Sequence, residues 1–388
     1  MSRAFNHVSF LFKVMGDPAA RVKTKDGMAH AIKANSGTLG EPMQKRILLA
    51  SVAIILGAAQ SSLAQNSTQQ ITVAYYGGNW GEAFDACVAQ PFTKATGIKV
   101  VAEIGNSTTT LAKLQQQAGN AVIDVAYMDG GISELAEDAS VLAPIDLSSL
   151  KNASALLPQA AYKNGDHVYA VSAGFYSLGL IYNTDEVTEK PETWEELWNE
   201  AHAGAVAIPS PNNSAGVPFV IFLDSIYGDK SEGMDATFAK LKTLDSGLLY
   251  DTSGAASNAF QSQEVTIGAH FNVGAWDLID AGLPIGFAVP KEGVWATDAR
   301  MHIAKGTKNP EAAAAFIDTA LTKEAASCLA EKLYLGPAIS GVSLSADIEQ
   351  KLPWGEGGSI DNLLLFNWNE VNAKRPAITD RWNREIAN

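Results

Sequence analysis

The sequence predicts an α/β fold of two lobes, each a mainly parallel sheet flanked by helices, joined by strands that cross more than once. Three observations support this. Strand patterns alternate at short spacing with helical segments. The chain beyond residue 64 has 324 residues, more than a single hydrophobic core usually serves. No long low-complexity linker divides it, so we expect lobes that exchange strands rather than two independent domains.

Residues 43–64 have the three parts of a secretory signal peptide. Two basic residues are followed by the uncharged run 47–59, and small residues stand at the −3 and −1 positions before a cleavage site expected after Ala64. A membrane span needs about 20 apolar residues, so this run is too short to be one. We interpret residues 1–42 as a mis-called start upstream of Met43 or as a disordered extension, and exclude 1–64 from the fold.

The first lobe is predicted from a regular alternation of strands and helices. A β-branched and aromatic run begins it, and the first helix is expected to end at Gly97, a residue suited to a left-handed C-terminal cap. The expected strands are 70–76, 98–104, 122–128 and the edge 141–146, and the expected helices are 82–95, 110–120 and 132–138.

The rest of the chain predicts a second lobe and a return to the first. Residues 165–187 are rich in β-formers and read as strands that cross between lobes, and 298–306 as the strand that crosses back. The segment 191–201 is predicted to be a helix, because Thr193 and Glu196 have the spacing of a capping box. Further strands are expected in 204–209, 264–272 and 284–293, and helices in 217–227, 234–243, 274–282, a pair in 309–333, and the tail 360–386.

Composition excludes several classes of function. The chain from residue 65 has 20 Lys and Arg against 39 Asp and Glu, a net charge of −19, so it repels nucleic acid and anionic lipid. It has no other apolar run long enough to span a membrane. No cysteine follows the cleavage site closely enough for a lipid anchor, so we expect the free form.

The sequence gives no sign of an enzyme, a cofactor or a metal site. The motifs GxSxG, HExxH, GxxxxGK[ST] and GxGxxG are absent in the contexts that their chemistry needs, and the four histidines beyond residue 64 are isolated. The only cysteines, Cys87 and Cys328, lie far apart in sequence. In an oxidising compartment they can form one disulfide or remain two separate buried thiols.

Aromatic and polar side chains recur after several predicted strands. The carboxyl ends of strands in open α/β sheets face the ligand crevice. Rings of Trp and Tyr hold ammonium groups by cation–π contact, and a carboxylate such as Asp129 or Asp298 would anchor an amine. The candidate ligand-binding residues are Tyr76, Asn79, Trp80, Met128, Asp129, Phe175, Tyr176, Asn212, Asn213, Phe271, Asn272, Trp295, Asp298 and Arg300.

Several segments together resemble a known family. They are "NWGEAF…PFTKATGIKV", "VLAPID", "GLIYNTDEV", "PETWEELWN" and "VPKEGVWATDARMHIAKGTKNPEAAAAFID". They look like the solute-binding proteins of polyamine-type ABC importers, over essentially the whole chain beyond the signal. The resemblance implies a type II periplasmic-binding-protein fold whose lobes, 65–172 with 296–337 and 173–295 with 338–388, close by hinge motion on a ligand. It also implies a periplasmic monomer, without cofactor, that delivers the ligand to a permease and an ATPase in the inner membrane.

The match at the expected ligand site is uneven. The resemblance adds Tyr334 to the candidates, but Ala83 stands where the family often has an aromatic residue. The loop "SPNNSAG" stands where its polyamine binders carry an acidic pair. A long diamine needs a carboxylate at each end, because a buried unpaired ammonium is costly. Arg300 could clamp a carboxylate, or form an ion pair at the surface or between lobes.

We therefore expect a receptor for a small amine-bearing solute that resembles putrescine or spermidine. The alternative is the same receptor fold holding a zwitterion such as γ-aminobutyrate or another amino acid. A third reading, an enzyme on a two-lobed scaffold, would require turnover of the bound molecule.

Overall fold

The computed structural model describes residues 69–231 and 233–387, which belong to one compact unit. The predicted signal peptide and the segment upstream of it lie outside these residues. Within the described part of the chain, no helix is both long and apolar enough to cross a bilayer.

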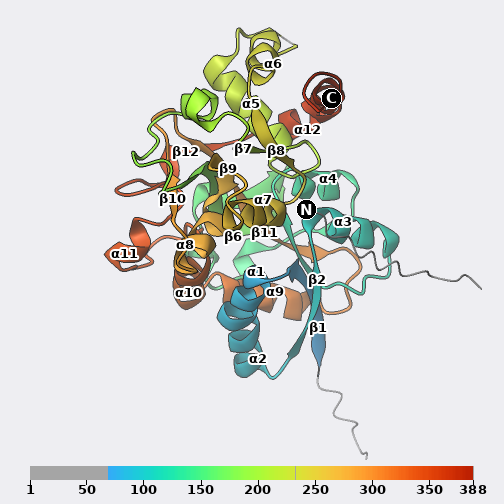
Figure 1. Ribbon diagram of the computed structural model, residues 1–388. Helices are drawn as coiled ribbons and strands as arrows, with labels where there is room; N and C mark the ends of the chain where they lie inside the picture. Colours follow the sequence, from blue (N-terminus) through green and yellow to red (C-terminus); the bar gives the residue numbers. More distant parts are fainter. Residues whose placement is uncertain (1–68, 232, 388) are drawn as a thin grey trace, which may run out of the picture. The chain divides into compact units, whose positions relative to one another are not determined.

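Two long strands, β6 (His167–Asn183) and β11 (Val294–Ala304), run antiparallel through the middle of a 12-stranded sheet (Figure 1). The main path of the sheet is β2-β1-β3-β11-β6-β9-β7-β8. At about 3.3 Å per residue, the 17 residues of β6 extend roughly 55 Å, enough to serve both lobes. The predicted α/β fold with crossing strands is confirmed. The expected lobe boundaries fall inside β6 and close to the start of β11, and they stay a prediction.

The first lobe is built on three parallel strands, with β11 antiparallel to the third. The strands are β1 (Gln70–Tyr76), β2 (Lys99–Gly105) and β3 (Val125–Asp129), with short β4 (Leu142–Ala143) and β5 (Ala161–Asn164) beside the crossing strands. The helices are α1 (Asn79–Phe84), a π-helical turn (Asp85–Ala89), α2 (Gln90–Thr96), α3 (Ser107–Gln116), α4 (Ile132–Asp138), α9 (Pro310–Ala320) and α10 (Lys323–Leu333).

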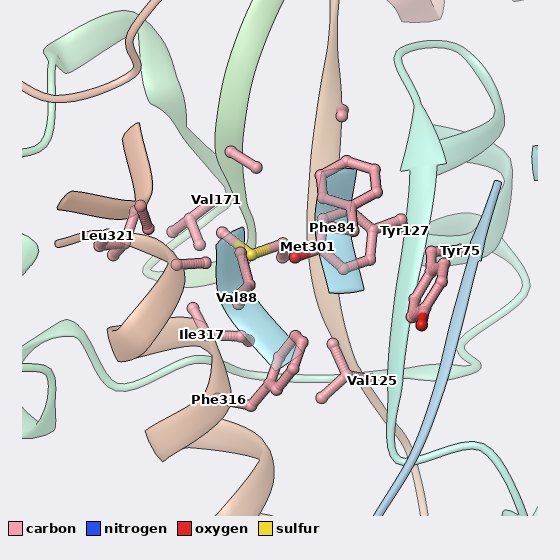
Figure 2. Close-up of a cluster of buried hydrophobic side chains, with 14 of the residues drawn as sticks. Tyr75, Phe84, Val88, Val125, Tyr127, Val171, Met301, Phe316, Ile317 and Leu321 are labelled. Atoms are coloured by element: carbon pink, nitrogen blue, oxygen red, sulfur yellow. The ribbon is translucent and has the colours of Figure 1, made fainter. Parts of the chain in front are cut away.

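The core of this lobe joins segments that are far apart in the sequence. Figure 2 shows Phe84 and Val88 of the first helical stretch beside Tyr127 of β3, Met301 of β11 and Phe316 of α9, all buried. Phe84 and Tyr127 pack with ring centroids 4.4 Å apart. Burial of such large rings contributes roughly 1.5–3 kcal/mol each, which fixes α1 against the sheet.

The second lobe repeats the arrangement around the other halves of β6 and β11. Its strands are β7 (Val206–Pro209), β8 (Ser246–Tyr250) and β9 (Ile267–Phe271), which run parallel, with β10 (Ile285–Ala288) on β6 and β12 (Leu363–Leu365) on β11. Its helices are α5 (Gly216–Tyr227), α6 (Asp235–Leu241), α7 (Ser253–Gln261), α8 (Asn272–Asp280), α11 (Ala346–Glu349) and α12 (Trp368–Glu385).

Most expected elements are present, and Gly97 caps the first helical stretch as predicted. Its φ of 75° is left-handed, and its N–H donates to the carbonyl of Thr93 at 2.8 Å. The stretch starts earlier than expected, at Asn79, and contains the π-helical turn. The predicted pair in 309–333 is present as α9 and α10.

Two local predictions were wrong. Segment 191–201 forms two 3₁₀ turns, Trp194–Trp198 and Glu200–His202, and the Thr193 side chain makes no cap. The Trp194 indole donates to the Gly293 carbonyl at 2.9 Å and its ring packs between Phe219 and Phe222, so tertiary packing overrides the local cap signal. The tail is not helical throughout, because strand β12 precedes α12.

Cys87 and Cys328 form a disulfide, with their Cα atoms 5.6 Å apart. The bridge ties the π-helical turn to α10 and joins two cysteines that lie 241 positions apart in the sequence. The sequence left a disulfide and two free thiols open, and the structure has the disulfide.

Candidate ligand-binding site

Strand direction gathers polar residues at one edge of each half of the sheet. In the first lobe β1 and β3 end at Tyr76 and Asp129, and Ser107 follows β2 as the first residue of α3. In the second lobe β7 and β9 are followed by Ser210 and Asn272. Because parallel strands present their carboxyl ends at the same edge, these are the positions where a ligand crevice is expected.

Asp129 is held by hydroxyl groups from two different strands. The Tyr76 hydroxyl of β1 donates to Asp129 Oδ1 at 2.5 Å, and the Tyr176 hydroxyl of β6 donates to the same oxygen at 2.6 Å. The backbone N–H of Asp129 donates to Ser107 Oγ at 3.0 Å. Both tyrosines use Oδ1 and the Ser107 hydroxyl also bonds to the carboxylate, so of its four acceptor positions one remains, on Oδ2.

The environment of this carboxylate has opposing effects on its charge. Burial raises the pKa of Asp129, while the hydroxyls of Tyr176, Tyr76 and Ser107 and the charge of Arg300 lower it. Burial and the Asp129 charge raise the pKa of both Tyr76 and Tyr176 well above its usual value. The two phenols are therefore protonated donors at neutral pH, and Asp129 is a partly buried carboxylate of raised pKa.

A row of aromatic rings runs past Asp129 from one lobe to the other. We call Tyr76, Trp80, Tyr176, Phe271 and Trp295 the aromatic row. Successive ring centroids lie 5.3, 5.1, 5.1 and 5.8 Å apart, each pair edge to face. The five residues of the row belong to β1, α1, β6, β9 and β11. The Trp295 ring also packs against the rings of Phe366 and Trp368. Tyr76, Trp80 and Phe271 are partly exposed, so they can offer ring faces to a ligand cation.

A buried ion network lies beside the row. We call Glu134, Tyr162, Asp298 and Arg300 the arginine network. Arg300 donates from Nε to Asp298 at 2.8 Å and from Nη1 to Glu134 at 2.5 Å. The Tyr162 ring lies 3.4 Å from the guanidinium carbon, and its hydroxyl donates to Asp298 at 2.9 Å.

The arginine network does not balance its own charge. Burial raises the pKa of Asp298, and the Arg300 guanidinium opposes that rise. Glu134 and Asp298 both bind the one guanidinium of Arg300, and the charge of Arg300 also acts on Asp129. An uncompensated buried negative charge is costly, so this region favours a cation.

Other predicted residues have internal roles in the structure. Met128 and Phe175 are fully buried core side chains. Asn213 caps the turn before α5, accepting from the Ala215 N–H at 2.9 Å. Asn212 donates to Asp251 at 3.4 Å. Their contact with a ligand stays a prediction.

Asn272 of α8 and Tyr334, which follows α10, belong to a second group. Asn272 accepts from the Ser177 N–H at 3.0 Å and donates to the Tyr334 carbonyl at 3.0 Å. The Tyr334 hydroxyl donates to Asp280, and its ring centroid lies 5.2 Å from the Lys351 ammonium. Asn79 is exposed and hydrogen-bonds to Asp277, whose pKa burial raises to about 6.

Sequence reasoning missed several residues of the site. Ser107, Glu134 and Tyr162 have no motif that distinguishes them from surface helix or strand residues. Trp368 had a helical signal only, yet its indole lies where a Cβ on Gly130 would fall, 2.2 Å from Nε1. Only glycine fits at position 130, and no pattern in the sequence reveals that approach.

Comparison with known proteins decides the family. The model of the family described as bacterial extracellular solute-binding protein matches residues 88–353. The chain belongs to this family. It is a solute-binding receptor of an ABC importer with the two-lobed type II fold, and it works in the periplasm, as the sequence predicted.

Individual relatives agree with that placement. The spermidine/putrescine-binding periplasmic protein of Escherichia coli K12 is 28% identical over 74% of this chain and 82% of its own length. The γ-aminobutyric acid-binding protein of Pseudomonas aeruginosa is 20% identical over 77% and 86%. The crystal structure of an ABC transporter from Clostridium perfringens has a TM-score of 0.68 at 24% identity, covering 81% of this chain and 99% of that one.

Proposed function

We propose that this receptor captures a small amine-bearing solute, with putrescine- or spermidine-like polyamines as the first candidates. The ligand ammonium binds Oδ2 of Asp129, and the partly exposed rings of Tyr76, Trp80 and Phe271 surround it. The observation that carries the proposal is the number of carboxylates beside the aromatic row, where Asp298 and Glu134 both pair with Arg300 and Asp129 has no ion-pair partner among the described residues.

The chemistry of these groups suits an ammonium ion. A cation over a Trp or Tyr face gains roughly 0.5–2 kcal/mol, more where water is excluded. A charge-assisted hydrogen bond to a carboxylate is about twice as strong as a neutral one. Tyr76 and Tyr176 already satisfy Oδ1 and hold the carboxylate in one orientation, so less entropy is lost when the ligand binds.

The receptor then delivers its ligand, unaltered, to a permease and an ATPase in the inner membrane, and it does so as a monomer. A binding protein needs reversible contacts rather than a nucleophile with a base. In the described ranges, no group of three or more His, Cys, Asp or Glu is arranged to hold a metal ion. Recovery of the ligand unchanged after prolonged incubation, followed by mass spectrometry, tests the absence of turnover.

A calorimetric screen tests the proposed ligand class. Putrescine, spermidine, γ-aminobutyrate, common amino acids, glucose and phosphate are titrated into the purified protein at pH 7. We expect dissociation constants in the micromolar range or below for one or more amines. Binding of the sugar or the phosphate alone would contradict the proposal.

A zwitterion such as γ-aminobutyrate is the second candidate, because two buried donors face no acceptor. Trp295 Nε1 and Thr297 Oγ1 have no hydrogen-bond partner among the described residues, and both side chains are more than nine-tenths buried. They stand two positions apart on β11, so their side chains share a face of the strand. A carboxylate would satisfy both groups, whereas a protonated polyamine brings donors only.

Two substitutions separate the candidates. Thr297→Val removes one donor at nearly constant side-chain volume, and Trp295→Phe removes the other while retaining a smaller aromatic ring. If the ligand is a zwitterion, each substitution weakens γ-aminobutyrate at least tenfold and leaves putrescine unchanged. If putrescine binds tightly and neither substitution alters the binding of any ligand, the zwitterion candidate is rejected.

A further inference from the structure

Hydrogen bonds connect the turn that follows Asp129 to the arginine network. After β3 the chain passes through Gly130 and Gly131 into α4. The Gly131 N–H donates to Glu134 Oε2 at 2.6 Å. The other oxygen, Oε1, accepts from Arg300 Nη1 at 2.5 Å and from the Tyr169 hydroxyl at 3.2 Å. One buried glutamate therefore links the turn to the guanidinium.

Arg300 also lies directly against the turn. A Cβ placed on Gly130 would fall 2.9 Å from Arg300 Nη2, so the guanidinium occupies the space beside that residue. In the register of the sheet, Arg300 pairs with Met128 and Ala299 with Asp129. Neighbouring strand residues alternate in direction, so the Arg300 and Asp129 side chains lie on opposite faces of the sheet. Arg300 is thus close to Asp129 while being separated from a ligand bound at Asp129 Oδ2.

Internal partners bind two of the guanidinium nitrogens and cover one of its faces. Nε binds Asp298, Nη1 binds Glu134, and the Tyr162 ring covers the guanidinium at 3.4 Å. Arg300 as a whole is only 1% exposed to solvent. Arg300 is therefore poorly placed to clamp a ligand carboxylate, but it is well placed to act on Asp129 through its charge and through the turn.

We propose that Arg300 is a positioning residue of the binding site: it holds the turn that carries Asp129 and keeps that carboxylate ionised, without touching the ligand. The role of Asp129 as ammonium anchor rests on the proposed function. The electrostatic action of Arg300 on Asp129 does not.

The groups that act on Asp129 are Tyr76 of β1, Ser107 of α3, Tyr176 of β6 and Arg300 of β11. Glu134 of α4 and Asp298 of β11 are the ion-pair partners of Arg300, and Arg375 of α12 lies beside Gly131 in the same turn. Arg300 is the cation whose charge lowers the pKa of Asp129. Removing it must therefore make Asp129 harder to ionise, whereas removing the negative charge of Glu134 must make it easier.

The test follows the titration of Asp129 in the ligand-free protein. Protein labelled with ¹³C at the aspartate carboxyl carbons is titrated by NMR, and Asp129→Asn assigns the signal. We expect Arg300→Met to move the Asp129 midpoint upward by about one pH unit, at the low end of what a nearby charge does. Glu134→Gln, which retains an oxygen for the Gly131 N–H, is expected to move it downward. Arg300→Lys keeps the charge and should restore most of the wild-type midpoint.

A matched control removes a different ion-paired arginine. Arg381 pairs with Asp235 at 2.7 Å and Glu385 at 2.9 Å, on α12. Arg381→Met should lower the melting temperature without changing the Asp129 midpoint. If Arg300→Met fails to fold, Glu134→Gln and Arg300→Lys still give the signed comparison. A purely structural role for Arg300 predicts equal midpoints in all folded variants, and that result would overturn the inference.

Ligand binding adds a second readout. For an amine that binds the wild-type protein, the pH at which affinity is halved should move in the same direction as the Asp129 midpoint in each variant. Midpoints that shift as expected, with no amine bound by the wild type, would reject the proposed function and leave the inference about Arg300 standing. Unshifted midpoints with tight amine binding would do the reverse.

Discussion

Replacing Asp129 with Asn changes the charge of the proposed anchor and little else. Asn is nearly isosteric, and its side-chain oxygen can still accept from the Tyr76 and Tyr176 hydroxyls. The charge-assisted bond to an ammonium is lost. Removing one partner of a partly buried, hydrogen-bonded charge pair costs about 2–5 kcal/mol. At 1.4 kcal/mol per tenfold, that is roughly 30- to 4,000-fold in the dissociation constant.

The same substitution should not weaken the fold. The pKa of Asp129 is raised in the folded protein, so the cost of ionising it develops as the pH rises from the unfolded-state pKa to the folded-state pKa and is complete above the latter. Asn carries no such penalty. We therefore expect the melting temperature of Asp129→Asn at pH 7 to equal or exceed that of the wild type, while affinity falls at least 30-fold.

Isothermal titration calorimetry with the tightest-binding amine, paired with differential scanning calorimetry, measures both quantities. Asp146→Asn is the matched control, because Asp146 is an exposed 3₁₀ cap whose role Asn can take over. It should leave affinity unchanged. A dissociation constant for Asp129→Asn within threefold of the wild type would refute the assignment of the anchor.

Three further predictions address the rings, the crosslink and a second carboxylate. Trp80→Ala removes ring contacts to Tyr76 and Tyr176 and should weaken amine binding at least tenfold by calorimetry with the far-ultraviolet circular dichroism unchanged; an unaltered affinity would remove Trp80 from the site. The double variant Cys87→Ser/Cys328→Ser should lower the free energy of unfolding, measured in urea, by several kcal/mol, up to roughly 5 kcal/mol from loop entropy for a bridge between cysteines 241 positions apart. Two free thiols in the unreduced, unfolded wild type would contradict the disulfide itself. Asp277→Asn should raise the melting temperature at pH 8 and leave it unchanged near pH 3.5, because the folded-state pKa of about 6 lies above the unfolded-state value, so that the cost of ionising Asp277 develops between pH 4 and 6. Equal shifts of the melting temperature at both pH values would argue against that pKa.

The sequence by itself determined the class of fold, the crossing strands and the family. The alternation of strand and helix patterns and the β-rich run that forms β6 depend on residues close together in the chain, so they can be recognised in a single sequence. Cap chemistry was reliable at Gly97, where backbone geometry demands a left-handed residue, and failed at Thr193, where burial of Trp194 prevails over the local preference.

Tertiary structure decided which of the candidate residues act together. Asp129, Trp80 and Tyr176 were all among the predicted ligand residues, but the sharing of Asp129 by two tyrosines from different strands depends on sheet register. The pairing of Arg300 with Asp298 and Glu134, which keeps it from the ligand in our proposal, depends on the contact between α4 and β11. A charge in a sequence has no partner until the chain folds, because the energy of an ion pair depends on distance and burial, and both are set by elements distant along the chain.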